Sequence, residues 1–145
     1  ELPQDTGNEG LNAALIKAVQ ECREKGIRFR YVVMGRPDRI DSMDMGTLLY
    51  NLLSNGIEAC MAVETERELE LVVREEDGTT EIFMENTISG SVLKNNPNLE
   101  SRKQDKRYHG FGMESIRGII GKYQGHYSYR EESGRFIQEI DLRDG

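Results

Sequence analysis

The 145-residue chain contains no tryptophan, three prolines and two cysteines. Its most apolar stretches, near residues 48–53 and 116–120, fall far short of the roughly 18 consecutive apolar residues that a membrane-spanning helix needs. Neither a transmembrane helix nor a signal peptide is therefore expected. Cys22 and Cys60 lack CxxC spacing and fall in the apolar stripes of predicted helices, so we expect them to be reduced core residues.

The chain also has no excess of positive charge, because 19 basic residues stand against 26 acidic ones and the formal net charge is −7. This balance excludes a broad basic surface for nucleic acid, so any phosphate must be held locally. The length and the mixture of apolar and charged residues predict a single globular domain over residues 1–145. The sequence starts at Glu1 and not at a methionine, which is typical of a piece excised from a longer protein.

Hydrophobic periodicity predicts three amphipathic helices and five strands. Thr6 and Glu9 have the spacing of a capping box before the first helix, and Asp77-Gly78 and Ser133-Gly134 are typical of hairpin turns. Alternating strands and one-sided helices predict a two-layer α/β sandwich, with the helices on one face of a mixed, mostly antiparallel sheet. We expect helices at residues 7–25, 44–63 and 112–125, a strand at 27–33, hairpins at 68–84 and 127–142, and an irregular connection at 87–109.

Two asparagines lie in the middle of the second predicted helix. Asn51 and Asn55 are four residues apart and Glu58 follows three residues later, so the three side chains project from one side. Asparagine prefers caps and turns to helix interiors. Two interpretations are open: a solvated helix face, or a site in which amide oxygens bind a hard cation such as Mg²⁺.

Glycines open the third predicted helix, within the segment His109–Met113. Gly110 and Gly112 would let the backbone approach a ligand while the helix N-terminus offers N–H groups to phosphate, although a simple loop with positive φ needs glycines too. The upstream basic residues either fold over a polyphosphate or form a solvated run. These residues are Lys103, Lys106 and Arg107.

A third polar feature, Glu85–Gly90, directly follows a predicted strand. A short polar side chain at a strand end, followed by a glycine turn, can present an amide to the edge of a planar base. The alternative for Asn86 is an Asx-type turn, which is the commoner use of asparagine at such a position.

The order and spacing of these three features resemble the GHKL (Bergerat) ATP-binding fold shared by gyrase, the Hsp90 chaperone, histidine kinases and the MutL repair protein. Residues 48–60 resemble its N box, 86–90 its first glycine box and 110–113 its second. The chain looks most like the catalytic domain of the sensor histidine kinases that serve peptide quorum sensing in Gram-positive bacteria. The shared residues are Glu58-Ala59-Cys60, Thr6-Gly7-Asn8, Lys25-Gly26-Ile27 and the run 106–116.

This resemblance implies binding of ATP and Mg²⁺, with Asn55 as the principal metal ligand and Asn51 as a second metal or phosphate contact, both catalytic. Asn86 replaces the aspartate that accepts a hydrogen bond from the adenine amino group, and Ile88 replaces a glycine of the first box. No phenylalanine-containing box precedes the second glycine box, so the lid, residues 87–109, has no assigned anchor. The implied cofactor-binding residues are Asn86, Gly90, Lys103, Lys106, Arg107, His109, Gly110, Phe111, Gly112 and Met113. We expect residues 91–108 to become ordered only when ATP binds.

The implied activity is that of a protein histidine kinase. The γ-phosphoryl group of ATP would go to a histidine on an upstream dimerisation helix that is absent here, since His109 lies in the glycine box and His126 begins a strand. ATP-hydrolysing relatives carry a glutamate at the position of Asn51, so we expect little hydrolysis. We also expect a response regulator as a partner, a homodimer at full length, a cytoplasmic position in a membrane-anchored sensor, and no contact with nucleic acid or membrane.

Two alternatives stay open. An anti-sigma-type serine kinase would share the fold, but it would act on a serine-bearing protein and would have no dimerisation helix upstream. A degenerate domain that has lost nucleotide would serve as a dimerisation or regulator-docking module. The departures at Asn86 and Ile88 keep this second alternative open.

Overall fold

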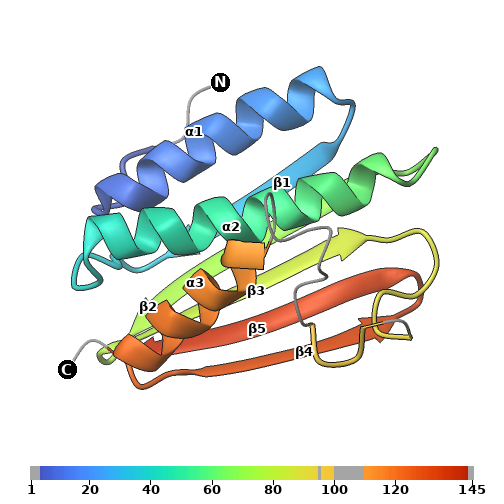
Figure 1. Ribbon diagram of the computed structural model, residues 1–145. Helices are drawn as coiled ribbons and strands as arrows, with labels where there is room; N and C mark the ends of the chain where they lie inside the picture. Colours follow the sequence, from blue (N-terminus) through green and yellow to red (C-terminus); the bar gives the residue numbers. More distant parts are fainter. Residues whose placement is uncertain (1–3, 95, 100–109, 144–145) are drawn as a thin grey trace.

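The computed structural model describes residues 4–94, 96–99 and 110–143, which form three helices and five strands (Figure 1). Every predicted element is present, with ends a few residues from those expected. None of the described helices is long and apolar enough to cross a membrane. In chain order the elements are α1 (Glu9–Glu24), β1 (Arg28–Met34), α2 (Ser42–Met61), β2 (Glu68–Glu76), β3 (Thr79–Thr87), α3 (Gly110–Lys122), β4 (His126–Glu132) and β5 (Arg135–Arg143).

The strands form one sheet in the order β1-β2-β3-β5-β4. The chain crosses over through α2 between β1 and β2, so these two strands are parallel, while the other neighbouring pairs are antiparallel. Both hairpin turns have positive φ at their two central residues, Asp77 and Gly78 in one and Ser133 and Gly134 in the other. Such turns match the twist of the strands that they join. The predicted mixed, mostly antiparallel sheet is confirmed.

The three helices lie on one face of this sheet (Figure 1). Along β2, Leu69, Leu71 and Val73 are buried beneath the helices, while Glu68 and Glu70 lie on the uncovered face. The central helix α2 buries a broad apolar side, and each large side chain buried there stabilises the fold by about 1.5–3 kcal/mol. The predicted two-layer α/β sandwich is therefore confirmed.

The start of α1 differs from the prediction, because Asn8 and not Thr6 is the N-cap. The Asn8 Oδ1 atom accepts a hydrogen bond from the Leu11 backbone N–H (3.1 Å), while its Nδ2 donates to the Pro37 and Ile40 carbonyls (2.9 and 2.8 Å). A hydroxyl has one proton to donate and could not bridge two carbonyls in this way. Ile40 is 2% exposed, so the turn before α2 contains a core residue.

The two cysteines are free and buried, as predicted. Burial, together with the neighbouring Cys60, raises the pKa of Cys22 to about 12. Cys22 is therefore a neutral packing residue at physiological pH and not a reactive thiolate.

Candidate functional site

The two asparagines of α2 face the start of α3. Asn51 Nδ2 donates to the Thr47 carbonyl one turn earlier (2.8 Å), which leaves Oδ1 directed out of the helix. A Cβ atom placed on Gly112 would lie 3.4 Å from Asn51 Oδ1 and 3.9 Å from Asn55 Nδ2. The structure therefore brings together Asn51, Asn55 and the second glycine box, and the absence of a side chain at Gly112 keeps space between them.

Helix α3 begins at Gly110, two residues earlier than predicted, so both glycines lie in its first turn. No acidic residue occupies that turn. The free N–H groups and the positive end of the helix dipole are thus not neutralised by a neighbouring carboxylate of the same turn. This arrangement suits an anionic ligand next to the amides of Asn51 and Asn55.

The opposite end of α3 is attached to the first turn of α2. Tyr123 Oη donates to Asp44 Oδ2 (2.6 Å) and accepts from the Asp41 N–H (3.1 Å), and Lys122 Nζ binds the same Asp44 oxygen (2.7 Å). Hydrogen bonds from Lys122 and then Tyr123 hold the pKa of Asp44 below its usual value, so the carboxylate stays ionised. These contacts set the position of α3, and the local sequence gave no signal for them.

Asn86 lies beneath α2, on the helix-covered face of β3, and is 2% exposed. Its Nδ2 donates to the Thr87 carbonyl (3.1 Å), and its Oδ1 would lie 3.6 Å from a Cβ atom on Gly56. Gly56 follows Asn55 directly. The structure thus places the first glycine box next to the N box, with the Asn86 amide oxygen directed toward the helix.

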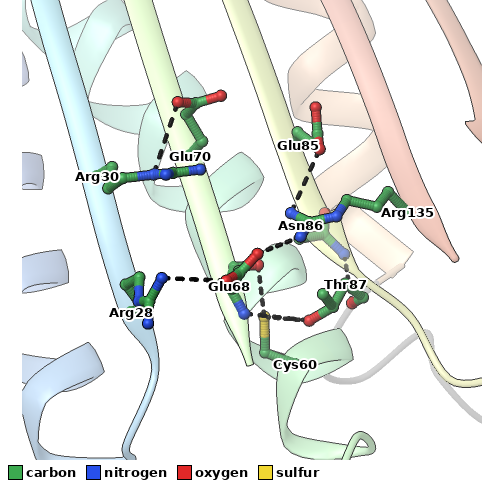
Figure 2. Close-up of polar contacts among 9 residues, drawn as sticks. All are labelled: Arg28, Arg30, Cys60, Glu68, Glu70, Glu85, Asn86, Thr87 and Arg135. Atoms are coloured by element: carbon green, nitrogen blue, oxygen red, sulfur yellow. Dashed lines mark hydrogen bonds and ion pairs between the residues drawn. The ribbon is translucent and has the colours of Figure 1, made fainter. Parts of the chain in front are cut away.

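A thiol joins the end of α2 to the strand end that carries Asn86 (Figure 2). Cys60 Sγ donates to the Glu68 carbonyl (3.3 Å) and lies 3.6 Å from Thr87 Oγ1, which also accepts from the Glu68 N–H (3.2 Å). The hydrophobic periodicity of α2 predicts only a core position for Cys60. Its contacts show that it also fixes the strand residue next to Asn86.

Ion pairs on the uncovered face fasten the same end of the sheet (Figure 2). Arg135 of β5 pairs with Glu68 of β2 and with Glu85 of β3 (3.3 Å), and Arg28 of β1 approaches Glu68 (3.5 Å). The hydrogen bond from Arg135, followed by its charge, lowers the pKa of Glu68. Four strands are connected in this way at the level of Asn86.

The structure describes only some of the remaining predicted site residues. Gly90 has a φ of +75°, which favours glycine, and Met113 packs against the hydrophobic core. Four residues, Lys103, Lys106, Arg107 and His109, lie outside the described part of the chain, as does the side chain of Phe111. Within the described part, no group of three or more His, Cys, Asp or Glu residues could hold a metal ion.

Comparison with known families identifies the architecture. The profile of the GHKL domain matches residues 40–143, which is most of the chain. The chain belongs to the GHKL family. GHKL domains bind ATP, typically with Mg²⁺. No curated protein sequence gives a significant match.

Several solved structures of similar fold are histidine kinases. The nucleotide-free catalytic domain of histidine kinase ThkA has a TM-score of 0.74 and 16% identity, over 99% of this chain and 96% of that one. Full-length ShkA with AMPPNP has a TM-score of 0.72 and 18% identity, over 97% of this chain and 30% of that one. The blue-light activated kinase EL346 of Erythrobacter litoralis has a TM-score of 0.69 and 16% identity, over 92% of this chain and 60% of that one. This GHKL domain thus has the fold of histidine kinase catalytic domains.

Proposed function

We propose that this GHKL domain is the ATP·Mg²⁺-binding catalytic domain of a sensor histidine kinase, which transfers the γ-phosphoryl group to a histidine on an upstream dimerisation helix. The observation that carries the proposal is the convergence of the Asn51 and Asn55 amides on the glycine-bearing first turn of α3. Hard amide oxygens beside a helix N-terminus fit a divalent cation together with phosphate.

Asn55 and Asn51 would hold the metal through their side-chain oxygens, and the N–H groups at the start of α3 would receive phosphate oxygens. Bound Mg²⁺ would neutralise charge on the phosphates during transfer. Because the Thr47 carbonyl fixes the Asn51 amide, its oxygen is oriented before any ligand arrives. Positioning of this kind is the main contribution of a phosphoryl-transfer site.

Asn86 would read the base. Its Nδ2 already donates to the Thr87 carbonyl, so the atom held toward Gly56 is the acceptor Oδ1. An acceptor there suits the amino group of adenine and disfavours the carbonyl of guanine. Asn86 can thus replace the family aspartate, which supports nucleotide binding over the nucleotide-free alternative.

The nucleophile would come from outside this chain. Asn51 cannot take a proton at neutral pH, so it cannot activate water as a general base. A neutral imidazole needs no strong base in order to attack phosphorus. We further propose the peptide quorum-sensing subclass, a response regulator as the next acceptor, a homodimeric full-length protein, and a cytoplasmic location in a membrane-anchored sensor.

Calorimetric titration with AMPPNP, with and without Mg²⁺, tests the binding step, and γ-labelled ATP tests the chemistry. We expect Mg²⁺-dependent binding, little free phosphate and no self-labelling. Supplying the upstream helical segment should yield acid-labile phosphohistidine. Absence of binding would favour the docking-module alternative, rapid hydrolysis would favour an ATPase, and labelling of a serine-bearing partner would favour the serine kinase.

A further inference from the structure

A single carboxylate holds the start of the segment that follows the first glycine box. This post-glycine segment comprises residues 91–94 and 96–99. Glu131 Oε1 accepts from Ser91 Oγ (2.7 Å), and Glu131 Oε2 accepts from the backbone N–H groups of Val92 and Leu93 (2.8 Å for Leu93). Ser91 Oγ in turn accepts from the Lys94 N–H (2.9 Å). One side chain therefore organises four consecutive residues.

Glu131 reaches this segment because of the alternation of β4. Tyr127, Tyr129 and Glu131 are half-buried on the helix-covered side, whereas Arg130 and Glu132 are exposed on the other. Partial burial raises the pKa of Glu131, but the hydrogen bonds from Ser91, Leu93 and Val92 outweigh it, and the net pKa lies below the usual value. The anchor is an ionised carboxylate at neutral pH, and its hydrogen bonds are of the strong, charge-assisted kind.

Two further contacts hold the rest of the post-glycine segment. Tyr129 Oη donates to the Pro97 carbonyl (2.8 Å), and Arg117 of α3 donates to the Asn98 carbonyl (2.8 Å). Leu99 is 7% exposed. The sequence predicts that residues 91–108 gain order only with ATP. Within this stretch the described residues, 91–94 and 96–99, have hydrogen-bond partners on β4 and α3, and residues 95 and 100–108 lie outside the described part of the chain.

We infer that Glu131 is a positioning residue for nucleotide binding, and that it anchors the post-glycine segment in place of the phenylalanine-containing box that the sequence lacks. The inference rests on the proposed function. The segment leads from the first glycine box, next to Asn86, toward α3, whose first turn faces Asn51. If the anchor is removed, the segment must be ordered each time that nucleotide binds, and this entropic cost weakens affinity.

Glu131→Gln weakens the anchor with little change in volume, because the amide carries no charge: its one oxygen can still accept from Val92 and Leu93, but through neutral hydrogen bonds, and its NH₂ group cannot accept from Ser91 Oγ. The matched control is Glu132→Gln, one residue further along β4 and exposed beside Arg130 (3.7 Å). Amide hydrogen exchange of the apo protein, AMPPNP affinity with Mg²⁺ and thermal melting are measured for wild type and both variants.

We expect Glu131→Gln to accelerate exchange at Val92 and Leu93 and to raise the AMPPNP Kd about fivefold to tenfold, with the melting temperature nearly unchanged. Ser91→Ala, which keeps both backbone hydrogen bonds, should have a smaller effect, and Glu132→Gln none. Unchanged exchange at Val92 and Leu93, unchanged affinity, or a uniform loss of protection over the whole fold would each overturn the inference. If wild type binds no AMPPNP, the proposed function fails, while the exchange measurement still tests the anchor.

Discussion

The two ends of the α2–α3 helix pair differ in whether their polar side chains have hydrogen-bond partners. At one end, Asp41, Asp44, Lys122 and Tyr123 form a network in which every member has a partner. At the other, Asn51 directs an oxygen away from its helix, and none of the described residues hydrogen-bonds to the side chain of Asn55. A satisfied network fixes helix geometry, while polar groups left for a ligand make a site. We therefore expect the first end to govern stability and the second to govern nucleotide binding.

The largest effect is expected at the binding end, with Asn55→Ala. The substitution removes a proposed metal ligand but little packing, because Asn55 is half-buried at the edge of the core. Affinity for AMPPNP·Mg²⁺ should fall about 100-fold, which corresponds to about 2.7 kcal/mol, while the melting temperature stays close to that of wild type. Titration calorimetry with and without Mg²⁺ measures the loss.

The matched control for this variant is Gln20→Ala, which removes an exposed amide from the middle of α1. It should leave affinity unchanged. Wild-type affinity for Asn55→Ala both with and without Mg²⁺ would remove Asn55 from the site.

At the opposite end of the helix pair, Tyr123→Phe should lower stability and leave nucleotide affinity nearly unchanged. Loss of the hydroxyl leaves Asp44 with one partner fewer and the Asp41 N–H without its acceptor. We expect a loss of about 1–2 kcal/mol in the free energy of unfolding, with less than about a threefold change in AMPPNP affinity. Urea denaturation and calorimetry on the same preparation measure the two. A larger loss of affinity than of stability would show that the two ends are not separable.

The positions of the polar residues at these two ends could be predicted from the sequence, but their long-range contacts could not. The positions of Asn51, Asn55, Gly110 and Gly112 follow from spacing along two helices, which is a local pattern. The link between Tyr123 and Asp44 joins residues 79 positions apart, and no periodicity encodes such a pair. The same holds for the contact of Glu131 with Ser91, 40 positions apart. The layer order predicted from the sequence is confirmed and the binding residues stay a prediction, while the contacts that orient them could not be predicted.

The stability that Asp44 contributes through its contacts with Lys122 and Tyr123 should also depend on pH. Hydrogen bonds from Lys122 and Tyr123 lower the pKa of Asp44 in the folded state. A depressed carboxyl pKa adds stability that is complete above the unfolded pKa of about 3.9 and is lost as pH falls through the folded value. The difference in unfolding free energy between wild type and Asp44→Asn should therefore be constant from about pH 7 to pH 5 and shrink below about pH 4. Urea titrations across this range check it, and a difference that grows on acidification would contradict the assigned sign.

The smallest effect is expected for Thr80, a buried residue near the start of β3. Thr80 pairs with Glu75 and Leu142 in the sheet and is fully buried, yet its hydroxyl has no hydrogen-bond partner among the described residues. Burial of an unpaired hydroxyl is unfavourable, and valine has nearly the same shape and an equal preference for strands. Thr80→Val should raise the free energy of unfolding by about 1 kcal/mol and leave nucleotide affinity unchanged, because Thr80 lies at the other end of β3 from Asn86.

Ser128→Ala, on the exposed side of β4, is a suitable control for loss of a hydroxyl. A destabilised Thr80→Val variant would mean that the hydroxyl has a partner after all, such as a buried water, and that this end of the molecule is satisfied throughout.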